Sequence, residues 1–188
     1  MSDDRQFAEN LRVSLWRGGI APVNWVEKVA DWVSVPEARA QQLLVGEGGR
    51  PTYEELERIA AGSGHPAEDL LHGDLLEGVD ILKENIGSLL ATLPHGGQLE
   101  FAKVIGVNPT TVSRWATGKL YPRGARNLAA IRDYFHLPAS VDIRSTPLFL
   151  ELGPIGSIAK RQWLHERIES LPADELHELY PALQKLVR

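Results

Sequence analysis

Apolar residues recur at helical spacing in a series of short segments, and most of these segments end at glycine or proline. In the first segment Phe7, Leu11 and Leu15 are four residues apart, which places them on one face of a helix. Gly18 and Gly19 follow and predict the end of this helix. Alternation of apolar and polar residues, the pattern of strands, is sparse. We therefore predict an all-α fold built from short amphipathic helices.

Further helices are predicted in the N-terminal part of the chain. Two of them open on capping-box pairs, in which a side chain and a backbone group three residues apart bond reciprocally. These pairs are Asn24 with Glu27 and Thr52 with Glu55. The helix between them begins at Pro36, a residue favoured at helix starts. The residues predicted to face inward are Trp25, Val29, Val33, Leu56 and Ile59.

A segment rich in glycine and aspartate, residues 73–80, predicts a linker. After it the helical pattern starts again, with helices predicted over about residues 82–93, 98–105, 109–117 and 124–136. Pro94 and Pro138 end the first and the last of these helices. The residues predicted to face inward in those two helices are Leu82, Ile86, Leu89, Leu90, Leu128, Ile131 and Phe135.

The two series of helices are similar at a constant offset. A shift of 72 positions superimposes apolar residues and a helix-ending glycine: Ala30 on Ala102, Val33 on Ile105, Val35 on Val107, Gly46 on Gly118, Leu56 on Leu128 and Ile59 on Ile131. Such self-similarity is typical of a repeated unit. We predict a first module over residues 1–76, a second over 77–140 and a C-terminal arm with a helical pair over 141–188. The alternative is chance agreement between two amphipathic segments.

The C-terminal part is less regular. Residues 141–144 alternate and predict a short strand or an extended arm, and the apolar residues 146–150 are expected to pack on another part of the chain. Two helices are predicted over about 156–170 and 173–187. Their apolar faces would form a homodimer interface or pack on their own chain, and the sequence leaves both options open.

The formal net charge of −5 is unevenly distributed. Residues 1–80 hold 7 Lys/Arg against 15 Asp/Glu, whereas residues 81–150 hold 8 against 4. The acidic first part repels phosphate, and the basic second part suits a nucleic-acid partner.

The chain has no cysteine, which excludes disulfides and cysteine-ligated metals. No apolar run reaches the roughly 18 residues of a membrane span, and the acidic start lacks a signal region, so we expect a cytoplasmic protein with no membrane partner.

Residues 98–122 carry the most specific pattern. Gly106 permits a tight turn between the two helices predicted over 98–105 and 109–117. Asn108 is a favoured N-cap residue before the second helix. Val112 and Trp115 are three residues apart and are predicted to face inward. The outer face is then left to Thr110, Thr111, Ser113 and Arg114.

Those outer residues suit a DNA groove, because arginine bonds guanine in a bidentate manner and hydroxyls bond bases or phosphates. We predict that Thr110, Thr111, Ser113 and Arg114 contact bases. Basic residues around this helix are placed to contact backbone phosphates: Lys103, Lys119, Arg123 and Arg126.

The stretch resembles the helix-turn-helix of the phage-repressor-like family (the Cro and XRE type). The matching residues are Gln98, Ala102, Gly106, Val112, Ser113, Arg114, Trp115, Gly118 and Pro122. The resemblance covers about residues 81–138, and residues 7–72 resemble the same fold through the 72-residue offset. It implies tandem lambda-repressor-like modules, with helix 109–117 in the major groove. By resemblance the base readers are Thr110, Ser113 and Arg114, and the phosphate contacts are Gln98, Asn108, Thr117 and Lys119.

The first module departs from the family pattern. Arg39, Gln41 and Gln42 occupy its matching helix and have side chains that suit base reading, but Glu37 and Glu47 flank them. Because phosphate contacts carry most of the affinity for DNA, we favour a non-DNA role for this module: it binds a protein partner or the other subunit, or it acts as a regulatory domain. A spacer that only supports the second module is the alternative.

The hypothesis that follows is a sequence-specific, double-stranded DNA-binding transcription regulator, most simply a repressor acting as a homodimer. The alternative is a protein-interaction adaptor or antitoxin-type regulator that uses the acidic first module. An enzyme is disfavoured, because phosphate-loop, dinucleotide and nucleophile-elbow motifs are absent. His165 and Glu169 lie one helical turn apart, but no second histidine completes a metal site. We expect no catalytic residues, metal or cofactor.

Overall fold

The computed structural model describes residues 3–152 and, beyond them, Leu164, Ile168, Leu171, Pro172, Glu175, Leu176, Leu179 and Tyr180. In this part of the chain every regular element is a helix, as the periodicity predicts. The helices predicted over 156–170 and 173–187 lie mostly outside the described residues, and so does the choice between a dimer interface and packing on their own chain. None of the described helices is both long and apolar enough to cross a membrane.

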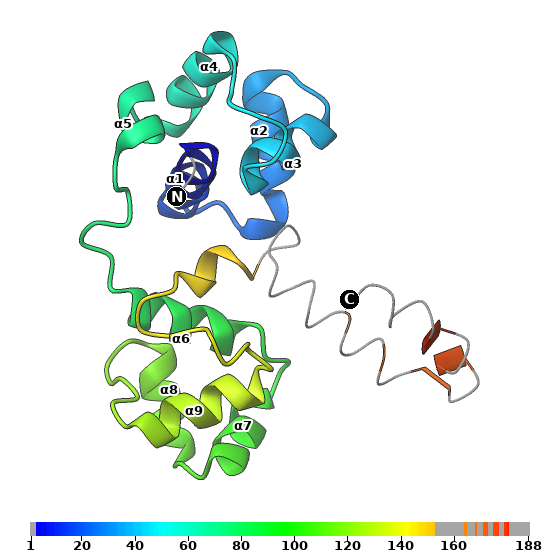
Figure 1. Cartoon of the computed structure of the whole chain (residues 1–188). Helices are drawn as coiled ribbons and strands as arrows, with labels where there is room; N and C mark the ends of the chain where they lie inside the picture. Colours follow the sequence, from blue (N-terminus) through cyan, green and yellow to red (C-terminus); the bar gives the residue numbers. More distant parts are fainter. Residues whose placement is uncertain are drawn as a thin grey trace.

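The first module is a cluster of helices around a core centred on α1 (Figure 1). Its elements are α1 (Asp3–Arg17), the 3-10 helix η1 (Pro22–Asn24), α2 (Trp25–Val33), α3 (Glu37–Val45), α4 (Tyr53–Ser63) and α5 (Ala67–His72). The inner faces predicted from the apolar spacing are confirmed, and the buried residues include Phe7, Leu11, Leu15, Trp25, Val29, Val33, Leu56 and Ile59.

Of the two predicted capping boxes, one forms. The backbone N–H of Glu55 donates to Oγ1 of Thr52 at 3.2 Å, and the N–H of Thr52 donates to the Glu55 carboxylate at 2.8 Å. The box predicted at Asn24 is wrong, because Asn24 makes no side-chain capping bond. Pro22 starts a 3-10 turn that runs directly into α2, so Asn24 adopts the conformation of that turn (φ −99°, ψ 1°) rather than the extended conformation of an N-cap residue.

The second module is a separate helical cluster, drawn in green and yellow in Figure 1. Its helices are α6 (Ile81–Ala91), α7 (Gly97–Ile105), α8 (Pro109–Ala116) and α9 (Ala125–Tyr134). The core is built from one face of each helix, as predicted, although Leu82 and Leu128 are only half-buried. Its buried residues include Ile86, Leu89, Leu90, Phe101, Ala102, Val112, Trp115, Ile131 and Phe135.

The two modules share a backbone plan. Three pairs of helices begin 72 residues apart: α2 and α7 at Trp25 and Gly97, α3 and α8 at Glu37 and Pro109, and α4 and α9 at Tyr53 and Ala125. Three pairs of residues in the left-handed conformation have the same offset: Ser34 and Gly106, Gly46 and Gly118, and Gly64 and His136. Helix starts and left-handed residues are independent features, so their common offset supports an internal repeat.

A buried asparagine in the first helix of each module holds the segment that follows the module's last helix. In the first module Nδ2 of Asn10 donates to the carbonyls of Leu70 (3.1 Å) and Gly73 (2.9 Å). Its Oδ1 accepts from the N–H of Leu75 at 3.4 Å. These bonds fasten the chain after α5 to α1, and Leu75 thereby joins the first core.

Asn85 does the same in the second module, 75 residues after Asn10. Its Nδ2 donates to the carbonyls of Ile143 and Thr146, both at 2.7 Å, and its Oδ1 accepts from the N–H of Phe149 at 3.1 Å. Both asparagines are almost completely buried, so these bonds satisfy polar atoms that water does not reach. The first helices of the modules therefore match at an offset of 75, three residues more than the helices that follow.

Residues 143–145 form a turn and residues 141–142 have no regular structure, so the strand predicted over 141–144 is wrong. The carboxylate of Asp142 accepts from the N–H of Arg144 at 3.0 Å, a local bond that favours a turn over a strand. Ile143 enters the core of the second module. The alternation that suggested a strand thus records one buried residue between exposed neighbours in a turn.

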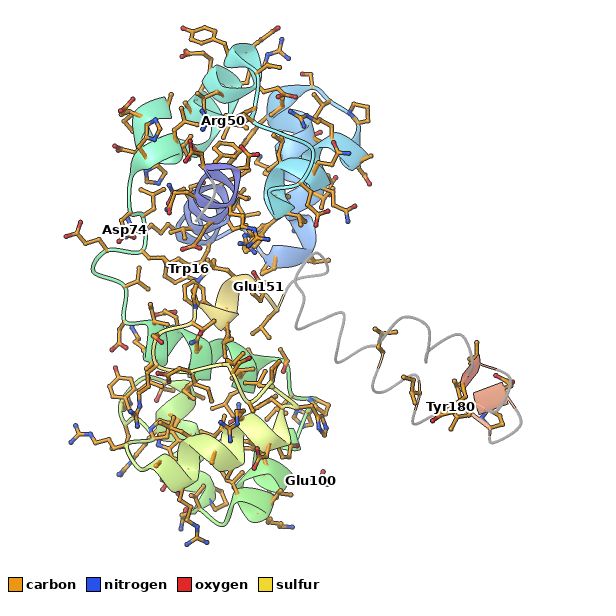
Figure 2. All side chains as sticks on the ribbon, in the orientation of Figure 1. Trp16, Arg50, Asp74, Glu100, Glu151 and Tyr180 are labelled. Carbon is orange, nitrogen blue, oxygen red and sulfur yellow. The ribbon has the colours of Figure 1, made fainter. Side chains whose placement is uncertain are left out.

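Residues 146–151, which we call the strap, join the two modules. They include the 3-10 helix η2 (Leu148–Leu150), which lies between the two helical clusters in Figure 1. Leu148 packs in the second core, while Phe149 and Leu150 pack in the first. The Phe149 ring lies 4.7 Å from that of Trp16, and Glu151 forms an ion pair with Arg12. Figure 2 shows Trp16 and Glu151 beside this crossing. The expectation that this apolar segment packs on another part of the chain is confirmed.

Candidate nucleic-acid interface

The α7–turn–α8 unit is formed by local features of the sequence. α7 ends at Gly106, whose φ of +73° is accessible to glycine at little cost. Two residues later the Oδ1 of Asn108 accepts from the N–H of Thr110 at 2.8 Å, which caps the start of α8 as predicted. Pro109 occupies the first helical position, where its missing N–H is not needed. These features hold α8 in a defined orientation after α7.

One face of α8 attaches it to the module and the opposite face is open to solvent. Val112 is fully buried, and Trp115 is 2% exposed among apolar side chains that include Phe101 and Ile131. The Nε1 of Trp115 is buried without a hydrogen-bond partner. This placement supports a core role for Trp115 rather than base stacking. Thr110, Ser113 and Arg114 are exposed, and Thr111 is half-buried at the edge of this face.

The cations predicted to contact phosphates lie in α7, just after α8 and at the start of α9. All of them are exposed, and none forms an ion pair with another described residue. Arg114 is likewise exposed and forms no ion pair with another described residue. The exposed cations without an ion pair in this region are Lys103, Arg114, Lys119, Arg123 and Arg126. Their charges are therefore free to meet an anionic partner.

Three polar residues complete the predicted phosphate contacts. Gln98 is exposed at the start of α7. Asn108 uses Oδ1 for the cap and keeps its amide hydrogens for a phosphate. The hydroxyl of Thr117 donates to the carbonyl of Ser113 at 3.0 Å, which uses its single hydrogen inside the helix end. Gln98 and Asn108 thus retain phosphate donors, whereas Thr117 does not.

The start of α9 adds a second feature that suits an anion. Its N-cap residue, Gly124, supplies no side-chain bond, and the first turn holds no acidic residue. The unbonded N–H groups of such a helix end attract negative charge. Arg123 and Arg126 lie on either side of this end in the sequence. Backbone donors and two guanidinium groups are therefore available to the same phosphate region.

The matching surface of the first module has the opposite charge. Asp31, Glu47 and Glu54 lie 72 residues before Lys103, Lys119 and Arg126 in the sequence, and all six side chains are exposed. If Lys103, Lys119 and Arg126 contact phosphates, the acidic side chains at the matched positions of the first module would repel a phosphate placed there. The charge difference between the modules is thus located at three positions that the sequence predicts to contact phosphate in the second module.

Arg39, the arginine of the matching helix in the first module, is occupied within its own chain. Its Nε and Nη2 each donate to the Glu55 carboxylate at 2.9 Å, and its Nη1 donates to the carbonyl of Gly48 at 2.9 Å. The bonds from Arg39 lower the pKa of Glu55 below its ordinary value. The Gln42 side chain lies close to Gly48 and is exposed. Arg39 therefore does not extend freely from α3.

One cation at the second module's surface has no signal in the local sequence. Lys83 comes from α6, outside the helix-turn-helix stretch, and its side chain lies along Gly118 at the end of α8. Only the packing of α6 against α8 brings it there. The signal that could have indicated it is Gly118 itself, because a side chain at this position would meet Lys83.

The described residues contain no group of three or more His, Asp or Glu side chains placed to hold a metal ion. Comparisons with protein-family models, with curated proteins and with solved structures find no match to this chain.

Proposed function

We propose that the protein binds double-stranded DNA in a sequence-specific manner and regulates transcription, with α8 in the major groove. The main support for the proposal is the polar face that α8 exposes opposite its buried face. Val112 and Trp115 anchor α8, and the solvent-facing side presents Thr110, Ser113 and an unpaired Arg114. Hydroxyls and arginine on one helix face are the donors that read base edges in the major groove.

The surrounding cations supply the second part of the interface. Lys103 and Lys119 lie on either side of α8 in the sequence, and Arg123 and Arg126 flank the uncapped start of α9. Such groups position a protein on the phosphate backbone without reading sequence. Two copies of the chain bound to half-sites one helical turn, about 34 Å, apart would give a pseudo-palindromic site. The simplest consequence is repression by blocking access to that DNA.

The experiment that tests this function is selection from a random double-stranded library with the purified full chain at moderate salt. The expected result is an enriched motif. Arg114→Ala is then expected to weaken binding to that motif by about 1–3 kcal/mol and to relax selection at one base position. Gln42→Ala, the matched change in the first module, is the control and leaves affinity and motif unchanged.

Two outcomes contradict the proposal in different ways. If no motif is enriched, the protein is not a sequence-specific DNA binder. If a motif is enriched and Arg114→Ala binds it as tightly as the original chain does, the assignment of α8 as the reading helix is wrong.

A protein-interaction or antitoxin-type role is the second candidate, carried by the first module. The occupied Arg39 and the exposed carboxylates of Asp31, Glu47 and Glu54 favour a basic protein partner there over DNA. The test replaces these three acids by Asn or Gln in the full chain. DNA affinity is expected to stay the same or rise, because repulsion is removed. A clear fall in DNA affinity would place the first module on the DNA and count against this role.

A further inference from the structure

Lys83 of α6 lies against the end of the proposed reading helix. Its Cε is 3.0 Å, and its Cγ and Cδ are 3.5 Å, from the position that a Cβ on Gly118 would occupy. Gly118 follows α8, has a φ of +66° and precedes Lys119. The glycine therefore leaves a path for the aliphatic part of the lysine side chain, which lies at the end of α8 beside the residue that precedes Lys119.

The same contact in the first module is made by an alanine. At the offset of 75 set by the two buried asparagines, Ala8 of α1 matches Lys83, and at the offset of 72 Gly46 matches Gly118. The Cβ of Ala8 lies 3.3 Å from the corresponding position on Gly46. Ala8 is 1% exposed, whereas the Lys83 side chain is 48% exposed. A methyl group is thus sufficient for this packing, and the charged end of Lys83 is not needed for it.

Two intramolecular interactions also involve this charge. The Nζ of Lys83 is 3.5 Å from the carboxylate of Glu84, its neighbour in the sequence, and exposed pairs of this kind contribute little. The carbonyl end of α8 favours a nearby cation through the helix dipole. A purely structural role for Lys83 would therefore affect helix stability and leave DNA binding unaffected.

We propose that Lys83 contacts a DNA phosphate beside Lys119, so that α6 takes part in holding the DNA backbone. The inference rests on the proposed function, and it extends the interface beyond the α7–α8 unit. Each phosphate neutralised by a cation adds about 0.9 to the slope of log affinity against log salt concentration. Lys83 is expected to account for one such unit.

The test measures binding of the full chain to a fluorescein-labelled DNA duplex of mixed sequence by anisotropy, over a series of KCl concentrations. Lys83→Ala is expected to reduce the magnitude of the salt slope by about 0.9 and the affinity by roughly five- to tenfold at low salt. Lys83→Arg is expected to keep the slope. Lys28→Ala removes the same charge from the first module, where Lys28 lies over the ring of Trp32, and is expected to change neither quantity.

The outcomes separate this inference from the proposed function. If the original chain binds the duplex and Arg114→Ala weakens binding to the selected motif, but Lys83→Ala keeps the full salt slope, the phosphate contact is wrong and the function stands. A lower melting temperature with an unchanged slope likewise overturns it in favour of a structural role. If the original chain binds no DNA, both fail. Ala8 at the matched position indicates that Lys83→Ala folds.

Discussion

The two modules have matching backbones and opposite surfaces. Buried positions agree at the 72-residue offset, for example Ala40 with Val112 and Leu43 with Trp115. Three matched exposed positions differ in the sign of their charge: the first module has acidic residues where the second has Lys103, Lys119 and Arg126. The comparison teaches that the fold depends on buried residues and turn conformations, whereas the choice of partner depends on residues that the fold leaves unconstrained.

The helix that follows the matched pair shows the same division. In the first module Thr52 and Glu55 close the start of α4 with a capping box, and Glu55 also holds Arg39. In the second module Gly124 leaves the start of α9 open between two arginines. The first module uses N–H groups at the start of α4 in its capping box. The second module leaves the N–H groups at the start of α9 available for an anion.

Asn85→Ala has the largest expected effect. It strips partners from the carbonyls of Ile143 and Thr146 and from the N–H of Phe149, and buried unpaired groups cost about 1–3 kcal/mol each. We expect the free energy of unfolding, measured by urea titration, to fall by about 3 kcal/mol or more. Asn10→Ala should cost a similar amount, and the exposed Glu100→Ala less than about 0.5 kcal/mol. A loss below about 1 kcal/mol for Asn85→Ala would refute the matched roles of the two asparagines.

Lys119→Glu installs the residue of the first module, Glu47, at the matched position. Replacing a phosphate contact by a repulsion is expected to weaken DNA binding roughly tenfold or more, to a similar degree for every sequence. Anisotropy titrations with the selected motif and with unrelated duplexes measure the loss of affinity and show whether it is similar for every sequence. Glu47→Lys is the reverse change, and it should leave the selected motif the same. A rise in affinity from Glu47→Lys as large as the loss from Lys119→Glu would show that the modules contact DNA alike.

Glu55→Gln tests the internal use of Arg39 through pH. Because hydrogen bonds from Arg39 hold the folded pKa of Glu55 below its ordinary value of 4.5, the stabilisation is present above pH 4.5 and is lost as pH falls through the depressed value. At neutral pH the substitution should lower the free energy of unfolding by about 1 kcal/mol. This difference should shrink on acidification. Asn127 occupies the matched position and does not titrate, so the effect of Asn127→Gln should be independent of pH; a constant difference for Glu55→Gln would contradict the assignment.

The smallest expected effect concerns the two helix starts. Gly124→Ser adds an N-cap hydroxyl to α9 and should raise the free energy of unfolding by a few tenths of a kcal/mol, seen as a small rise in melting temperature. The hydroxyl would occupy a backbone donor that we assign to phosphate, so DNA affinity should fall slightly. Thr52→Gly makes the opposite change in α4, with a similar small loss of stability and no change in DNA affinity. Tighter DNA binding by Gly124→Ser would argue against an anion at the start of α9.

The helices were predictable from the sequence because their signals are local. Apolar spacing determines which face is buried, and Thr52, Asn108 and Gly106 mark helix ends within a few residues. The same local reasoning was wrong at Asn24, where a 3-10 turn begins at Pro22. A local pattern cannot distinguish two turn types that use the same residues.

The long-range contacts were not predictable in this way. Asn10 and Asn85 bond to segments about 60 residues away, and a single asparagine in an amphipathic helix does not indicate such a partner. The hydrogen bonds that hold Arg39 depend on Glu55 in the next helix. The position of Lys83 depends on the packing of α6 on α8. Of the candidate interface, the exposed residues of α8 and their cationic neighbours were therefore predictable from the sequence. The place of Lys83 beside the end of α8 required the fold.

The strap affects how the protein can be divided in the laboratory. Phe149 and Leu150 lie in the core of the first module although they follow the second in the chain. A fragment that begins after the linker would expose both side chains, and a fragment that ends before residue 146 would leave a gap in the first core beside Trp16. Neither truncation is a clean domain, and insoluble fragments would say nothing about DNA binding. Point substitutions in the intact chain are the appropriate way to assign roles to the two modules.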